Sequence, residues 1–168
     1  MVAMVNIAWG YDRNTVKASN DILEVKDKYF ALRSKTEDQS YFQKVGIEPT
    51  VVVNGFTYRF CNFEKNQSVL REKYNTHTVR NEPTVIQMVL NERGNIGVSS
   101  TTTLGYFSVT HPEEYKKLLI SEINDSVYHR HFIIRNDAVI SPEIFNEYLQ
   151  SIKNNGTFQT ILKKYGLQ

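Results

Sequence analysis

Val51-Val52-Val53-Asn54-Gly55-Phe56-Thr57 sets three β-branched residues directly before a glycine turn. A continuous apolar triplet of this kind is typical of a strand buried on both faces, as strands of parallel sheets are. Gly55 permits a tight bend, and free backbone N–H groups at the start of a following helix can bind a carboxylate or a phosphate. An ordinary turn would have the same sequence features. The stretch therefore predicts a buried strand and marks Gly55, Phe56 and Thr57 as candidate ligand-binding residues.

Strand and helix patterns alternate on both sides of this stretch. Apolar or β-rich runs predict strands at 2–9, 28–33, 96–98 and 127–135, of which the first is expected to be buried. Helical spacing predicts helices at 57–75, 83–90 (ended by a left-handed Gly94), 112–119, 142–153 and 158–165, and a short helical turn at 40–45. Such alternation predicts an α/β fold, with a mostly parallel sheet and helices on both faces. Ligands of these sheets lie at the carboxyl ends of strands, which selects the loops 10–13, 54–58 and 99–103.

Composition excludes several classes of protein. Over 168 residues a formal charge of +2 gives no electrostatic reason to expect a nucleic acid or an anionic membrane as partner. One cysteine, Cys61, excludes an internal disulfide framework and any multi-cysteine metal site. No apolar run approaches the roughly 20 residues that span a bilayer, and the first five residues lack the features of a secretion signal. Composition alone indicates a soluble globular chain.

The selected loops carry residues that could bind a polar ligand. Arg13 could hold an anion through its guanidinium, although a lone arginine is more often a surface charge. Trp9 could stack on a ligand, and core packing is its commoner role. Ser100 and Thr101 belong to the hydroxyl run 99–103, which could line a polar pocket or form an exposed strand end.

Neither a metal site nor catalytic chemistry is expected. His129 and His131 share one face of a predicted strand, but two histidines make only half a zinc site. Cys61 is expected to be a buried, inert thiol, because no histidine is near it in the sequence. The chain has no nucleophile elbow, kinase-like motif or glycine-rich dinucleotide fingerprint. We therefore expect a protein without a cofactor that is not an enzyme.

Four motifs in the same order resemble the solute-binding proteins of bacterial amino-acid transporters (family 3), which have the type II periplasmic-binding-protein fold. They are Ala8–Arg13 (Ala-Trp-Gly-Tyr-Asp-Arg), the 51–57 stretch, the helix from Pro83 to Gly94 followed by Asn95-Ile96-Gly97-Val98, and the ending Asn155-Gly156-Thr157-Phe158 to Lys164-Tyr165-Gly166. The resemblance implies two lobes joined by two crossing strands, with a ligand held between the lobes. Residues 1–37 would be part of lobe 1 and the outgoing hinge strand, 38–125 would be lobe 2, and 126–168 would return to lobe 1.

The same resemblance implies roles for the candidate residues. Arg13 would bind a ligand carboxylate, the backbone N–H groups of Phe56 and Thr57 would meet the same anion, and Trp9 and Phe56 would be apolar walls. The hydroxyls of Ser100 and Thr101 would satisfy further polar groups of the ligand. The implied function is extracytoplasmic binding of a small polar or anionic, amino-acid-like solute for the membrane permease of an ABC transporter. The alternative is a ligand-sensing domain fused to a membrane signalling protein.

The sequence also departs from the family pattern. Ser100 and Asn95 stand where the family has acidic residues, so the chain is expected to lack the charge partner of a ligand ammonium group and the carboxylate that an enzyme of this fold would need. Ala8 replaces a threonine. Roughly 60 residues that usually begin lobe 1 have no counterpart. An incomplete lobe 1 predicts weak ligand binding and a surface through which two copies could pair.

Overall fold

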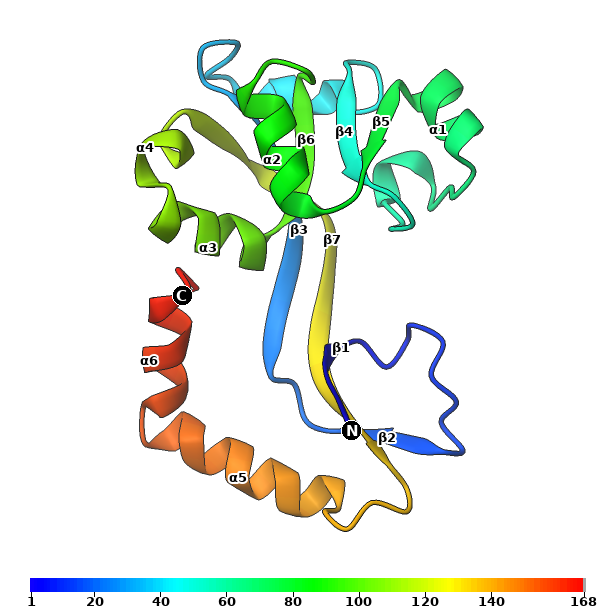
Figure 1. Ribbon diagram of the computed structural model, residues 1–168, viewed down its shortest axis with the longest axis vertical. Helices are drawn as coiled ribbons and strands as arrows, with labels where there is room; N and C mark the ends of the chain where they lie inside the picture. Colours follow the sequence, from blue (N-terminus) through cyan, green and yellow to red (C-terminus); the bar gives the residue numbers. More distant parts are fainter. Residues whose placement is uncertain (168) are drawn as a thin grey trace. The chain divides into compact units, whose positions relative to one another are not determined.

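The Val51–Val53 triplet forms β4 (Thr50–Val53), all four residues of which are buried. The computed structural model describes residues 1–167. In it β4 pairs in parallel with β5 (Thr76–Val79) and with β6 (Ile96–Ser100), and the three strands lie side by side in Figure 1. The prediction that residues 51–53 form a buried strand with parallel neighbours is confirmed. Val51 and Val53 pack into one apolar cluster and Val52 into another, because successive side chains of a strand point to opposite faces.

The parallel strands belong to a mixed sheet of seven strands in the order β1-β7-β3-β6-β4-β5, with β2 also paired to β7. The remaining strands are β1 (Val2–Val5), β2 (Val16–Ala18), β3 (Leu23–Leu32) and β7 (Leu118–Arg135). β3 is antiparallel to β6, and β1 and β2 are antiparallel to β7. The predicted α/β class is confirmed, but the sheet is mixed and not mostly parallel: the pairs of β4 with β5 and β6 are parallel, whereas β1, β2 and β3 pair antiparallel.

Four of the α-helices begin at a residue whose side chain caps them. The α-helices are α1 (Gln67–Tyr74), α2 (Glu82–Leu90), α3 (Thr101–Thr110), α4 (Pro112–Tyr115), α5 (Pro142–Asn154) and α6 (Thr157–Lys164), with 3₁₀ turns η1 (Gln39–Lys44) and η2 (Arg59–Cys61). The side chains of Asn66, Asn81, Ser100 and Ser141 accept backbone N–H groups at the starts of α1, α2, α3 and α5. No helix in the described part of the chain is both long and apolar enough to span a membrane.

Four local predictions are wrong. The 57–75 segment is not one helix: Asn62 and Phe63 have φ of +52° and +59°, so η2 ends there and α1 starts only at Gln67. Gly94 is not the left-handed residue that ends α2; that conformation belongs to Glu92, with a φ of +56°. A glycine is needed at position 94 because a Cβ there would lie 2.2 Å from Cγ2 of Val51. The helix that begins at Pro112 ends at Tyr115, and β7 follows it. The strand expected at 2–9 ends at Val5 and is mostly exposed.

The chain divides into two compact units. Unit 1 comprises residues 1–25 and 127–166, and unit 2 comprises residues 26–126. The chain leaves unit 1 within β3, between Val25 and Lys26, and returns to it within β7, between Ser126 and Val127. Each unit is therefore connected to the other by two strands of the same sheet.

Unit 2 contains both apolar clusters of the described residues, one on each face of its strands. One cluster packs strand residues against Phe42 of η1, Cys61 of η2 and Leu70 of α1. The other packs Phe30 and its neighbours against α2 and α3. Helical segments thus cover both faces of this part of the sheet, as predicted. Burial raises the pKa of the Cys61 thiol, as expected for an inert cysteine.

Unit 1 buries much less apolar surface. Its buried residues are Ser19, Ile22, Val25, Ile133, Ile134 and Leu149. Ile144, Tyr148 and Ile152 follow one another at four-residue spacing on α5 and are all exposed, and α6 has no buried residue. We expect the stability of the chain to come mainly from unit 2.

Buried tyrosines make this stability sensitive to alkaline pH. Burial raises the pKa of Tyr29, with the hydrogen bond to Asp125 adding to the effect, and burial also raises the pKa of Tyr58. A folded-state pKa above the unfolded value of about 10 gives stability that is complete below pH 10 and is lost as pH rises further. We expect the midpoint of urea unfolding to be constant from pH 8 to 9.5 and to fall by pH 11. Tyr58→Phe should flatten that decline, and an equally steep decline in this variant would contradict the assignment.

Candidate functional site

The carboxyl ends of β4, β5 and β6 lie at one edge of unit 2. The three strands are parallel, with Val53 opposite Val79 and Val51 opposite Gly97. The loops that follow them, residues 54–58, 80–82 and 100–103, therefore emerge together, and we call them the strand-end edge. Two of the three loops selected from the sequence, 54–58 and 99–103, meet at this edge.

The loop after β4 is a tight turn rather than the start of a helix. Gly55 has a φ of +80°, in the left-handed region that favours glycine. The Phe56 N–H donates to the Val53 carbonyl at 3.4 Å, so it closes the turn and is not the free N–H group expected from the sequence. The Phe56 ring is 53% exposed. The half-buried Thr57 follows it, before η2. A role of these residues in ligand binding remains a prediction.

A buried carboxylate holds the far end of this loop. Asp125, 1% exposed, accepts the N–H of Arg59 at 2.9 Å and the N–H of Phe60 at 3.0 Å. It also accepts the hydroxyl of Tyr29 at 2.7 Å. The Tyr58 hydroxyl in turn accepts the Val53 N–H at 3.0 Å. The turn is therefore fixed at both ends by buried hydrogen bonds that no local sequence pattern reveals.

Ser100 and Thr101 lie at the amino end of α3, where their hydroxyls already have partners. The Glu82 carboxylate accepts the Ser100 N–H at 2.5 Å, the Ser100 hydroxyl at 3.0 Å and the Thr103 hydroxyl at 2.5 Å. The Thr101 hydroxyl accepts the Lys26 N–H at 3.1 Å. The hydroxyl run is thus the end of β6 and the first turn of α3, and Ser100 is 2% exposed.

The strand-end edge carries acidic groups that the sequence analysis missed. Glu82 is the first residue of α2, after the short segment that follows β5, and Asp27 lies opposite Ser100 in the pairing of β3 with β6. Asp27 accepts the Ser126 hydroxyl at 2.7 Å. Glu82 places a carboxylate directly on Ser100, and the absence of a charge partner for a ligand ammonium stays a prediction. The Asn81-Glu82-Pro83 sequence predicts a helix start, but it does not predict the contact between Glu82 and Ser100.

Trp9 and Arg13 lie in unit 1. Trp9 is 53% exposed, so it is not a core residue, and the Arg130 guanidinium carbon lies 4.6 Å from its ring centroid. Tyr128 also approaches Trp9, with 5.6 Å between ring centroids. Arg13 lies in an exposed turn, and its side chain makes no hydrogen bond or ion pair to residues 1–167. Arg13 is therefore available to an anion, and its ligand contact remains a prediction.

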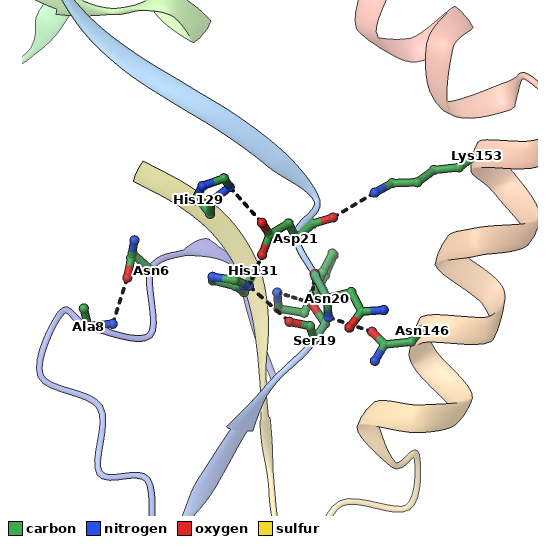
Figure 2. Close-up of polar contacts among 10 residues, drawn as sticks. Asn6, Ala8, Ser19, Asn20, Asp21, His129, His131, Asn146 and Lys153 are labelled. Atoms are coloured by element: carbon green, nitrogen blue, oxygen red, sulfur yellow. Dashed lines mark hydrogen bonds and ion pairs between the residues drawn. The ribbon is translucent and has the colours of Figure 1, made fainter. Parts of the chain in front are cut away.

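The two histidines of β7 face a carboxylate (Figure 2). His129 Nδ1 lies 2.8 Å from one oxygen of Asp21, and His131 Nδ1 lies 3.5 Å from the other. His131 Nδ1 is also 3.1 Å from the Ser19 carbonyl, and Lys153 donates to the Asp21 carbonyl at 2.8 Å. Among residues 1–167 no three potential ligands are placed to hold a metal ion. We interpret this cluster as a structural tie between the turn at Asp21, β7 and α5.

Two shallow surface hollows lie in unit 1, one lined by residues 147–155 and one by residues 15–16 and 135–137. Neither is lined by a residue predicted to bind a ligand. We therefore define the candidate site by the convergence of strand ends and polar groups in unit 2.

No model of a known protein family matches the sequence, and no curated protein matches it. Solved structures do match the fold. One of them is a protein of Wolinella succinogenes, described as the binding component of an ABC transporter and complexed with lysine. It superposes with a TM-score of 0.72 at 12% identity, and the match covers 98% of this chain and 68% of the Wolinella chain. The chain has the type II periplasmic-binding-protein fold. The fold implied by the sequence motifs is thereby confirmed.

Two further structures support the same assignment. The second substrate-binding domain of an amino acid ABC transporter from Streptococcus pneumoniae gives a TM-score of 0.64 at 22% identity, over 92% of this chain and 66% of that one. The GluR0 ligand-binding core from Nostoc punctiforme, in complex with L-glutamate, gives a TM-score of 0.67 at 14% identity. The match covers 98% of this chain and 71% of that one. The chain thus spans about two-thirds of the length of these structures.

Proposed function

We propose that this chain binds a small, polar, amino-acid-like solute outside the cytoplasm and delivers it to the permease of an ABC transporter. The observation that carries the proposal is the strand-end edge of unit 2, where Ser100, Thr101 and the turn at Gly55 emerge from parallel strands. Loops in this position are where open α/β sheets bind their ligands. The match of the fold to lysine-bound and glutamate-bound proteins supports the solute class.

In this proposal the residues divide by role. Phe56 and Trp9 offer exposed aromatic surface to apolar parts of the solute, and Arg13 offers a guanidinium to its carboxylate. Thr57 and the Thr101 hydroxyl, which accepts the Lys26 N–H and can still donate, supply polar contacts, and Ser100 would do so by exchanging its hydrogen bond to Glu82 for one to the solute. Residues 38–125 would act as one lobe, residues 1–37 and 126–168 would belong to the other, and β3 and β7 would supply the hinge strands.

We propose no reaction for this site. The carboxylates of Glu82 and Asp125 are each held by three hydrogen bonds from the chain itself, which suits a structural or recognition role better than proton transfer. Pairing of two copies through the incomplete lobe 1 stays a prediction of the sequence.

A thermal-shift screen tests the binding proposal. The probes are L-lysine, L-arginine, L-glutamate, putrescine and succinate, each up to 10 mM, and L-cystine up to its solubility limit. A solute at about 100 times its Kd stabilises the folded state by about 2.7 kcal/mol, and we expect at least one probe to raise the melting temperature by several degrees. Thr101→Val should reduce this shift, because it removes a hydroxyl at the strand-end edge.

The matched control is Asp137→Asn, which alters an exposed ion pair with Arg135 in unit 1 and should leave the shift unchanged. Isothermal titration then gives the affinity of each active probe. If no probe at 10 mM moves the melting temperature of the folded chain, the proposed function is wrong for this solute class.

A further inference from the structure

Helix α5 has two apolar sides, and among residues 1–167 only one of them is covered. On the covered side, the ring of Phe145 lies 4.5 Å from a phenylalanine ring of β7, centroid to centroid, and Leu149 is buried. On the other side, Ile144, Tyr148 and Ile152 are exposed, and Tyr148 has 67% of its surface accessible. Residues four apart lie on one face of a helix, so these three form a single row, which we call the α5 stripe.

The stripe belongs to a unit that leaves much of its apolar surface uncovered. Among the described residues, unit 1 has twelve exposed large hydrophobic residues and five buried ones, whereas unit 2 has six exposed and twenty buried. Helix α6, which follows α5, adds the exposed Ile161 and Tyr165, again four residues apart. Contiguous apolar surface of this kind marks sites of protein–protein contact, so we looked for the partner that the stripe fits.

The α5 stripe is symmetric about its central residue. Ile144 and Ile152 are the same residue type and lie four positions before and after Tyr148. Two antiparallel α5 helices that cross a two-fold axis at Tyr148 would therefore pack Ile144 of each copy on Ile152 of the other and Tyr148 on its own counterpart. A two-fold interface requires such a self-complementary surface, because both copies contribute the same patch. Tyrosine is also a residue that is enriched at the centres of interfaces.

The charges around the stripe favour the same orientation. Glu143 and Glu147 lie in the first half of α5, whereas Lys153 lies near its end and Lys163 and Lys164 follow in α6. A parallel pair of α5 helices would place acidic residues beside acidic residues. An antiparallel pair places the acidic half of each helix beside the basic end of the other, and it also opposes the two helix dipoles.

We infer that the chain forms a two-fold dimer through the α5 stripe, with the two α5 helices antiparallel and Tyr148 at the axis. The partner is a second copy of this chain. The inference assigns a surface and an orientation to the pairing of two copies that the sequence predicted. It does not depend on solute binding, because the stripe belongs to unit 1 and the strand-end edge to unit 2.

Sedimentation velocity on the wild-type chain tests whether the dimer forms. We expect monomer at about 5 µM and mostly dimer at about 200 µM, because a contact between two single helices is smaller than the interfaces of tight complexes. Raising the NaCl concentration from about 0.05 to about 0.5 M should weaken association at least threefold, since salt screens exposed charges. A wild-type chain that remains monomeric at 200 µM overturns the inference.

Two substitutions at the axis test the orientation. Tyr148→Lys and Tyr148→Glu should each weaken association at least tenfold, because each brings two like charges together at the axis. An equal mixture of the two variants should regain the wild-type dimer, since lysine of one copy then meets glutamate of the other. The matched control is Val109→Lys, which places the same charge at an exposed apolar position of a helix in unit 2 and should leave association unchanged.

The remaining outcomes are equally decisive. If both charged variants associate like the wild type, or if their mixture associates no better than either variant alone, Tyr148 does not meet its own counterpart and the inference is wrong. Circular dichroism establishes that each variant is folded. If a charged variant fails to fold, Tyr148→Cys replaces it: mild oxidation should link two copies through residue 148, whereas Val109→Cys should remain unlinked and the buried Cys61 should not react. Absence of that link likewise overturns the inference.

Discussion

Gly97→Ala should destabilise the protein by about 3 kcal/mol or more, the upper end of what overpacking a core costs. A Cβ at this position would lie 2.3 Å from Cζ of Phe30 and 2.7 Å from each of its Cε atoms. Phe30 is opposite Gly97 in the pairing of β3 with β6, and its ring is fully buried. The ring cannot move away, because it belongs to the cluster that packs against Val85, Ile86 and Val89 of α2.

Urea unfolding followed by circular dichroism measures this effect as a lower midpoint. Phe30→Leu in the Gly97→Ala background makes space for the new methyl group, so the double variant should be more stable than the sum of the two single effects predicts. Gly156→Ala is a comparison for backbone strain without overpacking, because Gly156 has a φ of +80° but nothing lies within 4 Å of the added Cβ, and it should cost less than Gly97→Ala. An unchanged midpoint for Gly97→Ala would show that the ring over Gly97 is free to shift.

The strands and helices that the sequence predicted correctly are those with strong local patterns. The triplet Val51–Val53 is continuous and apolar, and β4 is buried on both faces. Helices α2 and α5 each combine a polar cap, a proline in the first turn and an apolar stripe. In these elements local preference and tertiary packing agree, so the residues alone were sufficient.

The errors arise where tertiary contacts override a local pattern. β5 was not predicted because Thr76-His77-Thr78-Val79 has few apolar residues, and it is a strand only through its pairing with β4. α3 was missed because it begins with three β-branched threonines, which are poor helix formers, and it is stabilised by contacts of Ser100 and Thr103 with Glu82.

The same limit applies to the candidate site. The hydroxyls of Ser100 and Thr101 and the turn at Gly55 could be selected from the sequence, because they follow predicted strands. Their carboxylate partners could not be, since Glu82 is 18 residues from Ser100 and Asp125 is 66 residues from Arg59 along the chain. The carboxylates beside Ser100 and Arg59 are therefore placed by the fold and could not be read from the hydroxyl run or from the turn at Gly55.

Asp125→Ala should cost about 3 kcal/mol, because hydrogen bonds to a charged group contribute roughly 1.5–3 kcal/mol each and their loss leaves buried donors without partners. Those donors are the N–H groups of Arg59 and Phe60 and the hydroxyl of Tyr29. The two amides that lose their acceptor belong to η2, the element that follows the turn at Gly55. We therefore expect the Arg59 and Phe60 amides to exchange with solvent at least tenfold faster, as measured by NMR, and any solute-induced thermal shift to weaken.

Tyr29→Phe separates the tyrosine contact from the two backbone contacts, because it removes one donor and leaves the amides bound to Asp125. Its amide exchange should resemble the wild type, and the effects of the two substitutions should not be additive, since they share one hydrogen bond. Asp125→Ala also removes a hydrogen bond that raises the pKa of Tyr29, so ultraviolet titration should show this tyrosine ionising at lower pH than in the wild type. Unchanged exchange at Arg59 and Phe60 in Asp125→Ala would mean that the η2 turn holds its shape without the carboxylate.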